Sequence, residues 1–283
     1  MDATPSTSVI TINRNREAHL ARLIEGLDRG AAPLECIVVD MGSSTTRTDG
    51  FVRHVPLPGH GLPLASARNA GRRAASGEIL VFLDVDCIPS ADLTAALEAA
   101  VKEHDALICC EVYYLPEGAV THAWTEAALS RSGVPHPARA FPTAGVSPAP
   151  HPGLFWSLAF AVRAETFDRI GGFDDEFTGY GAEDTDFAFR AAAINVPTLF
   201  AGAGRAFHQR HESFDPPIQH VGDIVKNAAR FHRRHGFWPM PDWLAAFSAN
   251  GLIEYFDDGH ITLLREAKPE EIEAARVPPT RPF

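Results

Sequence analysis

The stretch that decides the fold is Glu78-Ile79-Leu80-Val81-Phe82-Leu83-Asp84-Val85-Asp86-Cys87-Ile88-Pro89. Its five apolar residues, 79–83, predict a strand buried on both faces of a sheet, and Pro89 is expected to end the pairing. Asp84 and Asp86 follow two positions apart, so an extended chain points both carboxylates at one place. Open α/β sheets bind ligands beyond the carboxyl ends of their central strands. Paired carboxylates there favour Mg²⁺ or Mn²⁺ shared with substrate phosphates, and the alternative is a solvated turn.

The composition is typical of a soluble globular protein, since 45% of the 283 residues are hydrophobic and 22% are charged. A net charge of −11 argues against nucleic acid as the principal partner. The four cysteines have no metal-ligand spacing, which predicts reduced core thiols in a cytoplasmic protein. The first residues, 1–5, do not open a signal peptide, so we expect none. No apolar run approaches the roughly 20 residues of a membrane span, so we expect no membrane-spanning helix.

The chain before this stretch predicts a β-α-β unit. Residues 9–12 and 35–40 are expected to be strands, and leucines at helical spacing between residues 20 and 27 predict the helix that joins them. This order, with an acid at the end of the second strand and a loop at 42–45, is typical of a Rossmann-like half. No Gly-x-Gly-x-x-Gly follows the first strand, so we expect no dinucleotide cofactor. The predicted fold class is α/β, with a mixed, mostly parallel sheet and flanking helices.

Regular alternation of helix and strand stops at residue 114. Residues 115–152 are rich in Pro, Gly, Ala and His, with one short helix expected at 121–130, and an irregular segment of that length is usually a functional loop. Beyond residue 238 we expect a small appendage made of a helix at 242–249, a hairpin at 251–264 and a charged tail. The other predicted elements are helices at 64–75, 91–102, 164–170, after 186 and at 217–235, and strands at 106–114, 154–162 and 197–201.

Four segments together resemble family-2 glycosyltransferases of the GT-A fold that carry a galactosyltransferase-like C-terminal segment. Two departures from the family pattern are Met41, where a second Asp is usual, and Tyr180, where a Trp is usual. The segments are Arg14-Asn15-Arg16; Val38-Val39-Asp40-Met41-Gly42-Ser43; Ala67-Arg68-Asn69-Ala70-Gly71 with Phe82-Leu83-Asp84-Val85-Asp86; and Gly171-Gly172-Phe173-Asp174 through Gly179-Tyr180-Gly181-Ala182-Glu183-Asp184.

The resemblance implies a glycosyltransferase domain at 1–237, with a nucleotide-binding half at 1–114 and an acceptor and catalytic half at 115–237, followed by the appendage at 238–283. It also implies an inverting, metal-dependent enzyme that moves a sugar from a nucleotide-sugar, a UDP-sugar, to a glycan or other hydroxyl acceptor.

The resemblance also implies roles for residues of the nucleotide-binding half. Asp40 is expected to accept a hydrogen bond from the uracil, and Arg14 and Arg68 to meet the base or the phosphates. Asp84 is expected to contact the ribose or a metal-bound water, and Asp86 to bind the metal directly.

His208 is expected to complete the metal site, with His211 as the alternative. A histidine ligand favours Mn²⁺ over Mg²⁺. The competing interpretation of this pair is a structural zinc site, but no cysteine or second histidine cluster has suitable spacing. His232 and His235 lie in a basic helix, and we expect both to be solvated.

Asp184 is the expected catalytic base. It lies in the first turn of a predicted helix, where the helix N-terminus stabilises an ionised carboxylate. The alternative explanation of the acids at 183–186 is that acidic residues are common at the starts of helices. This explanation suits Asp186, which is spaced to pair with Arg190. For the acceptor side we expect Glu183 to bind hydroxyl groups, and Trp156 and Tyr180 to stack on sugar faces.

Two other functions stay open at this point. A sugar-nucleotidyltransferase shares the Rossmann-like half and the acidic metal site, although it would want a Gly-rich basic loop after the first strand. A nucleotide- or glycan-binding module without catalysis is the non-enzymatic alternative, and it predicts that some of the acids Asp40, Asp84, Asp86 and Asp184 would be missing.

Overall fold

The computed structural model describes residues 6–30, 35–43, 52–59, 61–279 and 281. The expected absence of a signal peptide at 1–5, and residues 44–45 of the expected loop, lie outside these ranges.

A single large sheet forms the centre of the molecule. β1 to β4, β6 and β10 run in one direction, and β9 lies antiparallel between β4 and β6, so the predicted mixed, mostly parallel sheet is confirmed. The strand order is β3 (Val52–Pro56), β2 (Glu35–Asp40), β1 (Thr7–Asn13), β4 (Ile79–Leu83), β9 (Ala159–Arg163), β6 (Leu107–Tyr114), β10 (Thr198–His208) and β5 (Cys87–Pro89), with β7 (Val134–Pro135) on β6 and β8 (Val146–Pro148) on β10.

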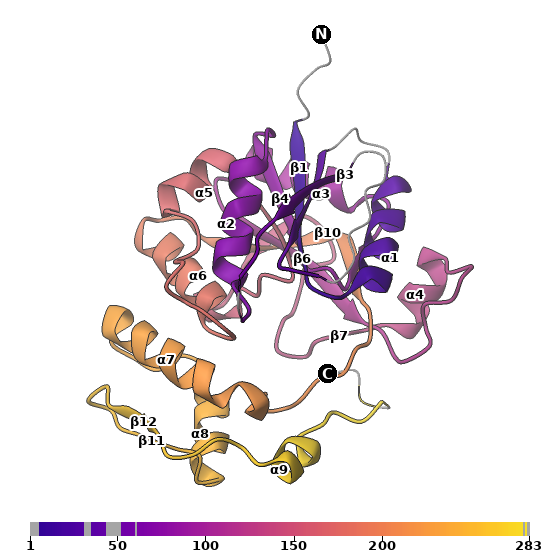
Figure 1. Ribbon diagram of the computed structural model, residues 1–283. Coiled ribbons are helices and arrows are strands. Elements are labelled where there is room, and N and C mark those ends of the chain that lie inside the picture. The colour runs from indigo at the N-terminus through magenta and orange to yellow at the C-terminus, as the bar shows by residue number, and fades with distance from the viewer. Residues whose placement is uncertain (1–5, 31–34, 44–51, 60, 280, 282–283) are drawn as a thin grey trace.

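Helices cover both faces of this sheet, as Figure 1 shows. Every residue of β4 is buried, and its side chains alternate between two hydrophobic clusters, Phe82 in one and Val81 in the other. The Phe82 cluster includes residues of α2 (Leu64–Ala74), α5 (Ala164–Ile170) and α6 (Glu183–Ala193). The Val81 cluster includes residues of α1 (Glu17–Asp28) and α3 (Leu93–Glu103).

The C-terminal elements gather along the lower edge of Figure 1 and share their own hydrophobic cluster. The predicted helix at 242–249 and hairpin at 251–264 are confirmed, and the charged tail that follows contains a short helix. These elements are η2 (Ile218–His220), α7 (Val221–His235), α8 (Pro241–Ala249), β11 (Ile253–Tyr255), β12 (Ile261–Leu263) and α9 (Pro269–Ala274). In the part of the chain that the structure describes, no helix has both the length and the apolar character to cross a bilayer.

The segment at 115–152 contains α4 (Glu126–Ser132) followed by the two short strands β7 and β8, and η1 (Pro152–Leu154) begins at its last residue. The prediction of a strand over 154–162 is wrong in its first half, because η1 and an irregular stretch come before β9. The apolar run there includes a turn that places Phe155 in the core and leaves Trp156 partly exposed.

The strand expected at 197–201 is more than twice as long. β10 continues to His208 through a register shift between Ala201 and Arg205, where Gly202 and Gly204 interrupt the pattern. The expectation that Pro89 ends the pairing is confirmed, since Pro89 is the last residue of β5 and is itself paired with Ala206. β5 is the last strand of the sheet, and an edge strand tolerates proline.

Candidate active site

Polar residues meet where the parallel strands end. Asn13 at the end of β1 is the register partner of Asp40 at the end of β2, and Tyr114 of β6 is the register partner of His208 of β10. Asp86 follows β4 at the same edge, and this is the edge at which open α/β sheets bind ligands.

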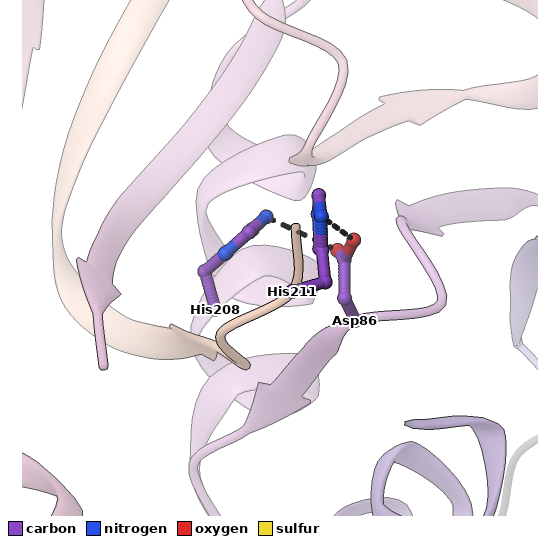
Figure 2. A group of neighbouring side chains, drawn as sticks. All are labelled: Asp86, His208 and His211. Carbon is purple, nitrogen blue, oxygen red and sulfur yellow. Dashed lines mark ion pairs between the residues drawn. The ribbon is translucent and has the colours of Figure 1, made fainter. Parts of the chain in front are cut away.

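Three side chains form a compact group at this edge, shown in Figure 2. Nε2 of His211 lies 3.1 Å from Oδ2 of Asp86, and Nε2 of His208 lies 3.5 Å from Oδ1 of the same carboxylate. One ligand atom from each of the three residues lies within 4.8 Å of the others. A carboxylate oxygen with two imidazole nitrogens is a donor set that Mn²⁺ accepts. The residues therefore fit a divalent cation.

Electrostatics favour the forms of Asp86 and His208 that bind metals. Burial alone would raise the pKa of the Asp86 carboxyl, but the two histidines hold that pKa well below its usual range. Burial lowers the pKa of His208. Burial also acts to lower the pKa of His211, but its hydrogen bond to Asp86 outweighs that effect and raises it. Metal ligands must be ionised carboxylates and neutral imidazoles.

A buried arginine joins the two halves of the site. Nη2 of Arg68 on α2 lies 3.2 Å from Asp84, and its Nη1 lies 3.2 Å from Glu183 on α6. Burial raises the pKa of Asp84 to about 6 in spite of this arginine. Burial and the neighbouring charge of Asp184 raise the pKa of Glu183 to about 7. Arg68 therefore compensates charge on both acids and fixes α6 relative to β4.

Asp184 lies in the first turn of α6, as expected. The backbone N–H of Ser157 points to its Oδ2 at 3.5 Å, and its other oxygen accepts from the Thr185 amide at 2.7 Å. Leu158, next to Ser157, accepts from the Asp84 amide at 2.8 Å. The chain at 157–158 thus connects the predicted base with the acidic residues after β4.

The predicted base-binding residues lie farther along the edge, two strands from β4. Asp40 is buried, and its carboxylate accepts hydrogen bonds from the backbone N–H and the hydroxyl of Ser43. Nη1 of Arg14 donates to the carbonyl of Gly61. Asp40 therefore holds the turn that follows its strand, and its contact with a base stays a prediction.

The two predicted aromatic platforms differ in their surroundings. Tyr180 stacks on His220, with ring centroids 4.7 Å apart, and lies near Trp243 at 6.2 Å. Trp156 meets His136 edge to face, with centroids 4.7 Å apart. The structure brings neither ring into the metal-binding group, and each stays a predicted acceptor contact.

The pairing of Asp186 with Arg190 is confirmed at 2.7 Å, but Asp186 is more than a helix-start acid. It is fully buried and also accepts from Arg234 at 2.7 Å and from His235 at 2.9 Å. The prediction that His235 is solvated is therefore wrong, because the imidazole binds a carboxylate on a neighbouring helix.

Two aromatic neighbours of the metal-binding group were not expected. The ring of Tyr114 lies 5.0 Å from that of His208, and the ring of His19 lies 6.3 Å from that of His211. Tyr114 could have been found from its place at the end of a parallel strand.

Comparison with known families gives two matches. A model described as "Glycosyl transferase family 2" matches residues 8–164, more than half of the chain. A model described as "N-terminal domain of galactosyltransferase" matches residues 149–212.

Two similar proteins illustrate the sequence relationship. The chain is 28% identical over 264 residues to validoxylamine A glucosyltransferase of Streptomyces hygroscopicus subsp. jinggangensis (strain 5008), covering 82% of this chain and 61% of that protein. It is 32% identical over 195 residues to pre-mycofactocin glycosyltransferase of Mycobacterium tuberculosis (strain ATCC 25618 / H37Rv), covering 65% of this chain and 38% of that protein. The chain thus spans less than two thirds of the length of these relatives.

Solved structures share the architecture. S. aureus TarS 1–349 superposes with a TM-score of 0.57 at 17% identity, covering 81% of this chain and 64% of that one. GalNAc-T7 with UDP, GalNAc and Mn²⁺ superposes with a TM-score of 0.56 at 16% identity, covering 88% and 58%. The predicted GT-A fold is confirmed.

Proposed function

The chain belongs to glycosyl transferase family 2, and on that premise we propose that it transfers a sugar from a UDP-sugar to a hydroxyl group of an acceptor with inversion. The observation that carries the proposal is the convergence of Asp86, His208 and His211 at the carboxyl edge of the sheet, with Asp184 at the start of α6 beside the same strand ends. Two neighbours in fold support a uridine donor, since GalNAc-T7 holds UDP, GalNAc and Mn²⁺ and S. aureus TarS 1–349 holds UDP-GlcNAc.

Asp86, His208 and His211 are the residues that would hold a divalent cation, Mn²⁺ or Mg²⁺. The cation would supply positive charge for the departing diphosphate without any proton transfer. Asp84, held by Arg68, is proposed to contact the ribose or a water of the cation, and Arg68 to balance negative charge from the buried side of the site.

The nucleotide base is proposed to lie over the ends of β1 and β2. Asp40 would accept the hydrogen bond of the uracil N3–H, and Arg14 would lie at the outer edge of the base or at the phosphates. The turn at Ser43, which Asp40 holds, positions that carboxylate.

Asp184 is proposed to take the proton of the acceptor hydroxyl. The acceptor oxygen forms a bond to the anomeric carbon while the bond from that carbon to the diphosphate breaks, and the hydroxyl proton passes to the carboxylate. Asp184 lies in the first turn of α6, where the positive end of the helix dipole faces its carboxylate. Glu183, Trp156 and Tyr180 are proposed to bind the acceptor.

The proposal is tested by screening UDP- and GDP-sugars for hydrolysis and for transfer to simple sugar acceptors in the presence of Mn²⁺. We expect turnover of at least one UDP-sugar in Mn²⁺ and no turnover in EDTA. The stereochemistry of the product, read by NMR, distinguishes inversion from retention. A protein that binds no UDP and turns over no donor would contradict the proposal.

A further inference from the structure

Arg139, between β7 and β8, is a buried cation without a counter-ion. Only 5% of the residue is exposed, and it pairs with no carboxylate among the described residues. Its Nε and Nη2 atoms are buried and have no hydrogen-bond partner in the described part of the chain. A buried charge with unsatisfied donors is unfavourable unless something else satisfies it.

The two unsatisfied nitrogens form one edge of the planar guanidinium. Their N–H groups are parallel, and this is the fork that binds both oxygens of a carboxylate, or two oxygens of a phosphate. The arrangement of the missing partners therefore matches one oxyanion rather than two separate acceptors.

Aromatic rings surround this guanidinium. Its central carbon lies 5.0 Å from the ring centroids of Phe141 and Trp156, and 5.1 Å from that of Phe200. Such contacts stabilise a cation in part, but they supply no acceptor for its N–H groups.

Arg139 and Trp156 line a small cavity together with Tyr114, His136 and Glu111. Glu111 is the acid of this lining, and its carboxylate lies 3.6 Å from the guanidinium of Arg205. The charge of Glu111 is therefore directed at another arginine. The Cys109 thiol lies within hydrogen-bond reach of the Arg139 guanidinium, but a thiol is a weak acceptor and does not neutralise the charge.

The cavity adjoins the proposed reaction centre on the acceptor side. The residue after Trp156 is Ser157, whose amide points to Asp184. On the other side, the ring of Tyr114 lies 5.0 Å from the ring of His208. The lining therefore includes the chain neighbour of the residue that contacts the proposed base and a ring that contacts a proposed metal ligand.

We infer that this cavity recognises an anionic acceptor, a sugar or related hydroxyl compound that carries a carboxylate or a phosphate, through a bidentate contact with Arg139. The inference rests on the proposed function for the identity of the site as an acceptor site. It goes beyond that function because it names the chemical class of the acceptor.

Binding is measured by calorimetry with glucuronate, glucose 6-phosphate and glucose at matched ionic strength. EDTA is present so that neither anion can bind through a cation, and each titration is repeated with UDP. We expect one of the two anions to bind about 10- to 100-fold more tightly than glucose, the range for a charge-assisted contact. The carboxylate and phosphate arms show which anion the site accepts. Equal affinity for all three compounds in both conditions would overturn the inference.

Two variants test the assignment to Arg139. R139Q removes the charge, and R139K keeps the charge but removes the planar fork. Both are expected to lose most of the preference for the anion over glucose, whereas R131Q, at an exposed arginine of the same segment, keeps it. The preference is measured as the ratio of the affinities for the anion and for glucose in the same preparation. A lower fraction of active protein changes both affinities alike and leaves this ratio unchanged. If R139Q does not fold, R139K and the wild-type comparison still decide the matter, and a variant that keeps the full preference would refute the assignment.

The two proposals fail in different ways. Preference for an anion in EDTA requires no donor and no cation, so it survives if the protein proves unable to turn over UDP-sugars. Turnover of a UDP-sugar with neutral acceptors alone, and no anion preference, would leave the glycosyltransferase proposal standing and refute the acceptor class.

Discussion

His208 is the register partner of Cys87 in the ladder between β10 and β5, and this pairing places its imidazole beside the carboxylate of Asp86. The backbone N–H of Gln209 donates to the carbonyl of Asp86 at 2.7 Å. This bond extends the pairing by one residue beyond the end of β10 and the start of β5. Backbone pairing therefore fixes Asp86 and His208 relative to each other.

Removal of the divalent cation should weaken UDP binding, because the diphosphate would then meet the Asp86 carboxylate without neutralising charge. D86A should lose the dependence on Mn²⁺, and H208A and H211A should each weaken it. Calorimetry with UDP, in Mn²⁺ and in EDTA, measures the effect. D28A, at an exposed carboxylate at the end of α1, serves as the control and should behave like the wild type. Equal UDP affinity of the wild type in EDTA would refute the metal site.

Replacing Asp40 should weaken UDP binding by about 1.5–3 kcal/mol, the contribution of a hydrogen bond to a charged group. D40A is the test, because an asparagine would keep an oxygen that can accept the same hydrogen bond; Asp40 also holds the turn at Ser43, which the alanine disturbs. S43A removes the hydroxyl contact to Asp40 and leaves the carboxylate, so it measures the effect of the turn alone. If D40A binds UDP as tightly as the wild type, the carboxylate does not contact the base.

Most of the fold could be predicted because its strands are apolar on both faces and end at acids. The continuous apolar run Ile79–Leu83 predicts a strand at the centre of a sheet with both faces covered, and every residue of this strand is buried. Pairing between distant strands leaves a weaker signal. The extension of β10 to His208 and the small strand β5 depend on each other, and neither carries a periodicity that the local sequence reveals.

The site residues that belong to motifs at strand ends could be predicted from the sequence. The contacts between side chains on different elements could not. Asp86 lies beside both His208 and His211, which the sequence offered as alternative ligands. The position of Arg68 between Asp84 and Glu183 depends on how α2 and α6 pack, and helix packing is not readable from one sequence. The same reason explains why Arg139 was missed, since only tertiary structure shows that its donors are unsatisfied.

Asp186 should be required for stability and not for chemistry. D186A leaves Arg190, Arg234 and His235 without their shared acceptor, and removing one partner from a buried charge network usually destabilises a protein by about 3–5 kcal/mol. Chemical denaturation measures the loss. H235A should lower the free energy of unfolding by less than D186A does, because the imidazole is one of three donors to Asp186. A D186A protein as stable as the wild type would contradict the role of the network.

Glu183 should make stability depend on pH. Its pKa is about 7 in the folded protein against a usual 4.5, so the folded protein binds the proton more tightly. This contribution is fully present below pH 4.5 and is lost as the pH rises through about 7. The stability difference between wild type and E183Q should therefore shift against the wild type as the pH rises through this window. E117Q, at an exposed glutamate, is the control and should show no such trend.

Asp184 and Asp186 lie in the same turn of α6, and substitution separates their roles. D184N keeps the size of the side chain and removes the proton acceptor, so turnover should fall by about 10²–10⁴-fold, the range for a positioned base. UDP affinity should change little, because the carboxylate is proposed to face the acceptor and not the diphosphate. If Asp184 merely stabilised the helix N-terminus, D184N would lose only a few tenths of a kcal/mol of stability, roughly the low end of such contributions, and turnover would stay near normal. Transfer rate, UDP affinity and thermal transition of the same preparation therefore distinguish the two roles. D175N, at an exposed acid of the preceding loop, is the matched control. A folded D184N protein that retains more than about half of the wild-type rate is incompatible with Asp184 as the base, and Glu183 then becomes the next candidate.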